Sequence, residues 1–125
     1  MYQLTLFSTP AILALAVCIF SLWRIRKYSN VAGTRGMIML LMSTIVWSVC
    51  QLAGTIVVDF PTKQAIAQFA YLGIAAGPVF WFSFCLSYSL GTEHAPRSLM
   101  AAVSIVPIMT VLLAFTNQYL SLIHI

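Results

Sequence analysis

Charged residues, and acidic ones above all, are nearly absent from this sequence. Among its 125 residues only Asp59 and Glu93 are acidic, and all charged residues together make up 6% of the chain. A soluble domain carries about 25% charged residues. The composition therefore excludes an ordinary soluble globular domain. The net charge of +4 does not indicate nucleic-acid binding either, because most basic residues cluster in one short segment between apolar runs.

Cysteine and histidine are scarce and scattered. Cys18, Cys50 and Cys85 all lie in apolar segments without CxxC spacing, and an odd number argues against a disulfide framework. His94 and His124 each stand alone, without the neighbouring ligands that a zinc site needs. We therefore expect no metal and no cofactor.

Apolar residues, in contrast, make up 62% of the chain. They form four runs without Asp, Glu, Lys or Arg, at residues 4–23, 37–58, 65–90 and 98–116. As a helix rising about 1.5 Å per residue, each run can cross a hydrocarbon core of about 30 Å. None shows the polar–apolar alternation of membrane strands. We expect an all-α fold, in which residues 1–125 form one integral membrane bundle of four transmembrane helices.

The basic residues predict how this bundle is oriented. With the N-terminus outside, the inner connections hold five of the six Lys and Arg residues, and the outer ones hold only Lys63. Cytoplasmic connections are enriched in Lys and Arg. We therefore expect a multi-pass protein of the cell membrane with its N-terminus outside. The inner basic residues are then Arg24, Arg26, Lys27, Arg35 and Arg97.

Catalytic patterns are missing as well. Asp59 and Glu93 fall in connections on opposite sides of the membrane, so they cannot act as a carboxylate pair. The sequence has no Ser/His/Asp arrangement and no phosphate-binding loop. We expect no catalytic residues and no enzymatic activity in this chain.

Two classes of membrane protein fit a chain of this length. A small four-helix transporter is one, but proton-coupled exporters generally use an ionisable residue within the membrane, and the four runs contain no Asp, Glu, Lys or Arg. A non-catalytic membrane assembly subunit is the other, and nothing in the sequence excludes it.

Small residues interrupt the third apolar run. Gly73 and Gly77 are four positions apart, so they share one helix face and let a neighbouring backbone approach closely. Pro78 removes one helical hydrogen bond and predicts a kink. We interpret Gly73, Gly77 and Pro78 as helix-packing residues.

Polar side chains gather toward the outer ends of the second and third runs. The second run carries a stripe at helical spacing, formed by Thr44, Ser48, Gln51 and Thr55. Because a short turn joins the two runs, we expect Gln51 and Thr55 to meet Gln68 and Tyr71 of the third run. One interpretation is hydrogen bonding between helices, worth about 1 kcal/mol or less per bond. The other is a small ligand-binding pocket that opens to the outside.

Three segments also carry a family pattern: SLWRIRKYSNVAGTRGMIMLLMSTIVWSVCQLAG, QFAYLGIAAGPVFWFSFCLSYS and IVPIMTVLLAFTN. The positions that define it are Trp23, Trp47, Gln68, Tyr71-Leu72-Gly73, Pro78, Phe84, Tyr88, Pro107 and Thr116-Asn117. In order and spacing, about Leu13 to Asn117 resembles the N-terminal seven-helix membrane region of bacterial and archaeal histidine kinases.

This resemblance implies a sensory input region of two-component signalling, with its N-terminus outside and a cytoplasmic output module such as a kinase core. The implied partners are the lipid bilayer, a small-molecule or lipid stimulus, and a second copy in a homodimer of the intact protein. We expect no nucleic-acid partner. The chain has four runs where the family has seven helices, and its tail, QYLSLIHI, departs from the family pattern. We therefore expect a truncated chain that lacks three helices and the output module.

Overall fold

The computed structural model describes residues 8–120, and the side chains of residues 8–116, as four long helices. They are α1 (Ser8–Ile25, followed by the short 3-10 helix η1, Arg26–Tyr28), α2 (Thr34–Ile56), α3 (Phe60–Leu90) and α4 (Arg97–Leu120). No strand occurs in this described part, and four helices are long and apolar enough to cross a membrane. The predicted all-α membrane fold with four spans is confirmed. The start of the first predicted run, residues 4–7, and residues 121–125 of the tail lie outside the described residues.

The helix α3 starts five residues before the predicted run of residues 65–90. The predicted run contains no charged residue, whereas the start of α3 includes Lys63. The helix begins at Phe60, where the Asp59 carboxylate accepts a hydrogen bond from the Thr62 backbone N–H at 3.0 Å. Such an N-cap satisfies one of the free N–H groups of the first turn. Hydrogen bonds from Thr62 lower the pKa of Asp59.

The same helix continues without interruption through Pro78 and ends at Gly91. Gly91 has a φ of +66°, a left-handed conformation that glycine adopts without steric cost. The backbone N–H groups of Gly91 and Thr92 then bind the last carbonyls of the helix, those of Tyr88 and Ser87. Both ends of the longest helix are thus fixed by local chemistry.

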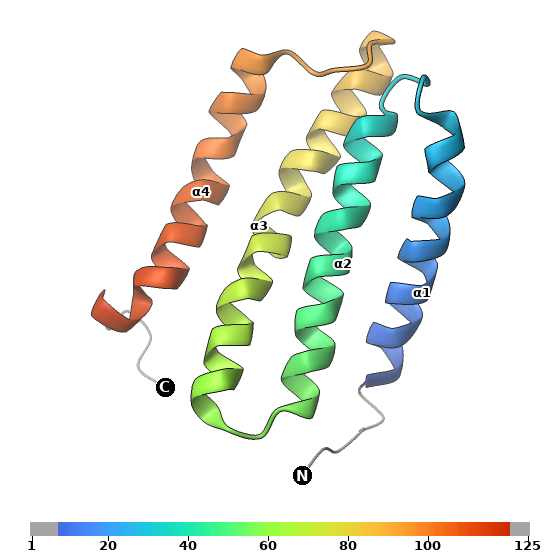
Figure 1. The fold of residues 1–125 in the computed structure, drawn as a ribbon. Helices are drawn as coiled ribbons and strands as arrows, with labels where there is room; N and C mark the ends of the chain where they lie inside the picture. The colour runs from blue at the N-terminus through green and yellow to red at the C-terminus, as the bar shows by residue number, and fades with distance from the viewer. Residues whose placement is uncertain (1–7, 121–125) are drawn as a thin grey trace.

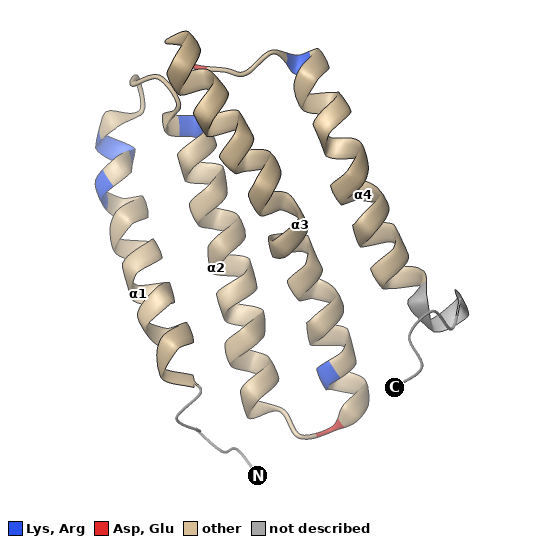
Figure 2. Ribbon diagram, turned by 180° about the vertical axis from the view of Figure 1, so that it is seen from behind, with Lys and Arg blue, Asp and Glu red and all other residues tan. Residues whose placement is uncertain are grey.

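The helices lie side by side in chain order and form one open layer (Figures 1 and 2). Each packs mainly against its neighbours in the chain. Accordingly, the buried apolar side chains in the described part are few: Cys18, Ala70, Ala75 and Val79. Large apolar side chains remain exposed on every helix, as expected for surfaces that contact lipid or further helices.

The contact between α2 and α3 is the most extensive in the layer. A Cβ atom added to Gly73 would lie 2.6 Å from the Ser43 carbonyl oxygen, and one added to Gly36 would lie 2.6 Å from the Phe84 backbone nitrogen. At Gly77 the nearest atom, Ser43 Oγ, would be 3.9 Å away, which is an ordinary contact. Backbone approach between the two helices therefore depends on Gly36 and Gly73 rather than on Gly77.

Most Lys and Arg residues lie at one end of the layer, near η1 and the α3–α4 connection, whereas Lys63 and Asp59 lie at the other end (Figure 2). At the basic end the Lys27 ammonium lies 5.1 Å from the centre of the Trp23 ring. This cation–π contact places an aromatic ring and a charge together. The pairing is typical of the boundary between hydrocarbon and head groups.

Candidate functional site

A cleft of about 420 Å³ separates α1 from α2 at the end of the layer where α1 begins. We call it the α1–α2 cleft. Its lining comprises Pro10, Ala11 and Ala14 from α1, and Trp47, Ser48, Gln51 and Thr55 from α2. One wall is therefore apolar and the other carries hydroxyl and amide groups.

The polar groups of this wall differ in how they are satisfied. Thr55 Oγ1 donates to the Leu52 carbonyl oxygen at 2.7 Å and lies 3.4 Å from Ser8 Oγ of α1. Ser48 is only 5% exposed, yet it forms no hydrogen bond with any residue that the structure describes. The Gln51 amide also has no hydrogen bond to a described residue. Among the hydroxyl and amide side chains of the cleft, one is thus bonded and two have no hydrogen bond to a described residue.

A second, smaller cleft of about 310 Å³ lies on the other side of α2, against the first turns of α3. Gln51 and Thr55 line this cleft as well as the first, so they stand between the two hollows. Lys63 of α3 lines the second cleft but not the first. Among the described residues, Lys63 is the only Lys or Arg that lines either cleft, and it lies on the opposite side of α2 from Ser48.

Gln68 and Tyr71 lie elsewhere. Gln68 Nε2 donates to the Ala114 carbonyl oxygen of α4 at 3.4 Å, and the 38%-exposed Tyr71 lines neither cleft. The reason is the helical rotation of about 100° per residue. Because Ala70 and Gly73 face α2, Gln68 falls on the face that looks toward α4. The structure brings Gln51 and Thr55 together but leaves Gln68 and Tyr71 apart from them.

The residues that sequence reasoning did not assign to the pocket are Ser48, Trp47 and the α1 wall. Ser48 was already part of the predicted polar stripe at helical spacing, and this spacing was the available signal. Pro10, Ala11 and Ala14 resemble any apolar membrane segment, so the sequence carried no signal that they form the opposite wall.

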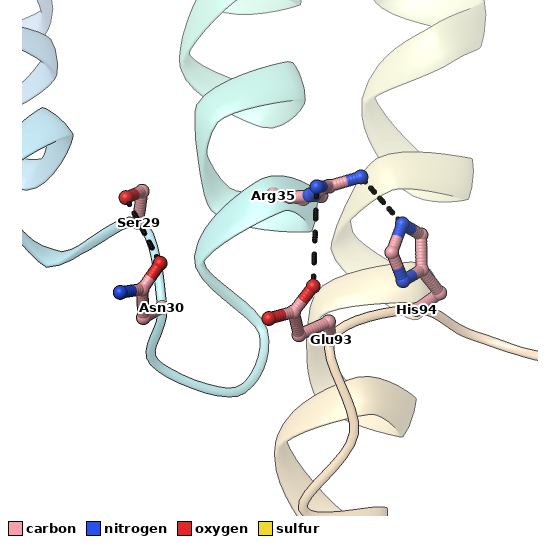
Figure 3. A network of polar contacts seen from close by, with 5 residues as sticks. All are labelled: Ser29, Asn30, Arg35, Glu93 and His94. Atoms are coloured by element: carbon pink, nitrogen blue, oxygen red, sulfur yellow. Dashed lines mark hydrogen bonds and ion pairs between the residues drawn. The ribbon is translucent and has the colours of Figure 1, made fainter.

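At the opposite end of the layer, Arg35 of α2 reaches the α3–α4 connection (Figure 3). Its Nη2 lies 3.9 Å from Glu93 Oε2, and its Nη1 donates a hydrogen bond to His94 Nε2. A guanidinium can only donate, so His94 Nε2 is the acceptor in this contact. Both partners of the ion pair are more than half exposed, and such pairs contribute little stability. The contact joins the first turn of α2 to the α3–α4 connection.

The α1–α2 cleft carries hydrogen-bonding groups beside an apolar surface. No ionisable side chain lines the α1–α2 cleft. The described residues also contain no group of three His, Cys, Asp or Glu side chains that could hold a metal ion. Two unpaired hydrogen-bonding groups beside an apolar wall are typical of small-molecule sites, which are mostly apolar with a few placed polar groups.

Comparison with known proteins places the chain in a family. No curated protein and no solved structure matches it. Residues 6–125 match the family described as the N-terminal 7TM region of histidine kinase, so the match extends over nearly the whole sequence. Together with four helices able to span a membrane, this match shows that the chain belongs to the N-terminal membrane region of histidine kinases.

Proposed function

We propose that this chain is the sensory input region of a two-component histidine kinase, which couples a stimulus from outside or within the membrane to a cytoplasmic kinase module. The observation that carries the proposal is the family match over residues 6–125. An uncharged polar cleft among membrane-spanning helices supports it, because a stimulus needs a binding site in this region. Phosphorylation activity belongs to the output module and not to these helices.

The proposed orientation places the N-terminus outside. Its support is the clustering of basic residues at the end of the layer that holds η1 and the α3–α4 connection (Figure 2), because cytoplasmic connections are rich in Lys and Arg. In this orientation the α1–α2 cleft lies in the outer half of the membrane and Arg35 lies at the cytoplasmic side. The intact receptor then acts as a homodimer, as the family resemblance implies.

A cross-link between α1 and α2 tests the sensory role without knowledge of the stimulus. Ser8 Oγ and Thr55 Oγ1 are 3.4 Å apart, so cysteines at these positions place two sulfur atoms within reach of a disulfide after small rotations. In the full-length protein, with Cys18, Cys50 and Cys85 replaced by Ala, oxidation of Ser8→Cys/Thr55→Cys should fix α1 against α2. We expect the rate of autophosphorylation in membrane vesicles to change severalfold.

The same sample after reduction with dithiothreitol is the matched control, and Ser8→Cys alone controls for the oxidant. If the cross-link forms completely and autophosphorylation is identical before and after reduction, these helices do not control a kinase and the proposed function is wrong.

A further inference from the structure

We propose that the α1–α2 cleft binds an uncharged amphipathic molecule with a single alcohol or amide head and a short apolar body. This inference rests on the proposed sensory function for its biological meaning, but the binding itself is measured independently of signalling. It extends that function by naming the chemical class of the ligand.

With the end of α2 placed at the membrane surface, its unpaired groups lie at hydrocarbon depth. Counted along the helix from Ile56 at about 1.5 Å per residue, Gln51 is about 7.5 Å and Ser48 about 12 Å from the end of α2. Half of the hydrocarbon core is about 15 Å thick. Little water is available at this depth, and an unbonded hydroxyl or amide is costly there. A ligand that bonds to Ser48 and Gln51 removes this cost.

Charge selects the head group. The lining of the α1–α2 cleft contains no Asp, Glu, Lys, Arg or His, so an ionised ligand would lose its hydration and gain no counter-charge. Ser48 and Gln51 can each both donate and accept hydrogen bonds. A neutral head that also does both, such as an alcohol or a primary amide, satisfies the two groups together.

Shape selects the body of the ligand. Pro10, Ala11 and Ala14 form an apolar wall opposite the polar groups, and Trp47, which is 41% exposed, also lines the cleft. A volume of about 420 Å³ lies within the range of about 300–1,000 Å³ for small-molecule sites. The cleft lies between two neighbouring helices that are each long and apolar enough to cross a membrane.

Bromine quenching of tryptophan fluorescence tests this site directly. The chain has three tryptophans, and Trp23→Phe with Trp81→Phe leaves Trp47 as the only one. In phosphatidylcholine nanodiscs, ω-bromoundecanol should quench Trp47 in a saturable way, and unbrominated undecanol should restore the fluorescence. Bromoundecane, which lacks a head, and ω-bromoundecane sulfonate, which is permanently ionised, should each quench only in proportion to their concentration in the bilayer.

Substitutions in the polar wall test the recognition of the head. Ser48→Ala and Gln51→Leu should each weaken bromoundecanol binding about five- to tenfold, the effect of one lost hydrogen bond. Thr110→Val is the control, because its hydroxyl is exposed on α4 and bonds its own helix at the Val106 carbonyl oxygen. Helix content by circular dichroism verifies folding, and Ser48→Ala changes too little volume to prevent it.

Two results would overturn the ligand class: bromoundecane or the sulfonate binding as tightly as the alcohol, or the wall variants binding like the parent. Non-saturable quenching by bromoundecanol would overturn the site itself. If the alcohol binds as expected but the Ser8–Thr55 cross-link leaves autophosphorylation unchanged, the site stands and the sensory function fails. If the alcohol does not bind but the cross-link changes autophosphorylation, the sensory function stands and the proposed ligand class is wrong.

Discussion

Replacing Gly73 by alanine should destabilise the helix pair α2–α3, whereas the same change at Gly77 should not. The new Cβ at position 73 would lie 2.6 Å from Ser43 O and 2.9 Å from Trp47 N, both backbone atoms that cannot rotate away. A contact of 3.4 Å, the lower limit of ordinary van der Waals approach, requires the helices to separate by about 0.8 Å at this point. At position 77 the nearest atom is 3.9 Å away, so the methyl group fits.

The magnitude follows from two opposing effects. Forcing one extra methyl group into a packed contact costs about 1–3 kcal/mol, and alanine is more favourable than glycine inside a helix by about 1 kcal/mol. The helix-propensity effect is the same at both positions of α3 and cancels in the comparison. We therefore expect Gly73→Ala to be less stable than Gly77→Ala by about 1–3 kcal/mol.

Equilibrium unfolding in mixed micelles of a mild detergent and sodium dodecyl sulfate, followed by circular dichroism, measures this difference. Gly36→Ala serves as a second test of the same contact, since its Cβ would lie 2.6 Å from the Phe84 nitrogen, and it should behave like Gly73→Ala. Equal stability of the Gly73 and Gly77 variants would refute the close approach of α2 and α3.

Three further predictions concern topology, the end of a helix and a hydrogen bond. In a chain without its native cysteines, Thr62→Cys should react with an impermeant thiol reagent from outside and Thr92→Cys only after permeabilisation; the reverse pattern would overturn the orientation. Because hydrogen bonds from Thr62 lower the pKa of Asp59, the contribution of Asp59 to stability should be fully present above its unfolded pKa of about 3.9 and be lost as the pH falls through the lower folded pKa. Asp59→Asn keeps a capping oxygen, and it should make the unfolding midpoint less dependent on pH between about pH 2 and 6. An unchanged pH profile would contradict this assignment. Gln68→Leu, which removes one bond to Ala114, should lower stability by about 1 kcal/mol or less and leave bromoundecanol binding unchanged; weakened binding would show that Gln68 belongs to the site.

The spans could be predicted from the sequence because length and lack of charge are local properties. Every predicted run corresponds to one of the four helices. The boundaries were less accurate where a charged residue belongs to a helix, as Lys63 does in the first turn of α3. The cap at Asp59 was the better indicator there, since an N-cap residue fixes a helix start by hydrogen bonding.

The direction in which each side chain points could not be predicted, because it depends on how each helix is rotated against its neighbours. Gln51 and Gln68 are both amides near the same end of the layer, yet one lines the clefts on either side of α2 and the other bonds to α4. Gly73 and Gly77 are equivalent as a pattern, but only Gly73 lies against backbone atoms. Gly36, which has the same close contact, occurs in no motif that the sequence makes visible.

Among the described helices, α2 packs more tightly against α3 than against α1. This difference determines which helix a molecule bound in the α1–α2 cleft can displace. On one side, α2 is in backbone contact with α3 at Gly36 and Gly73, so this pair cannot easily adjust. On the other side, α1 faces α2 through the α1–α2 cleft, and the hydroxyl contact between Ser8 and Thr55 is 3.4 Å long. A ligand in the cleft is therefore accommodated most easily by a shift of α1.

Beyond the far end of α1, polar contacts link three segments of the chain. The connection after α1 is tied to α2 by a 2.9 Å hydrogen bond from Thr34 Oγ1 to the Tyr28 carbonyl oxygen. The next residue, Arg35, contacts Glu93 and His94 in the α3–α4 connection (Figure 3). Because these last contacts are exposed and weak, they can rearrange at small cost. The α1–α2 cleft and these exposed polar contacts thus lie at opposite ends of the layer.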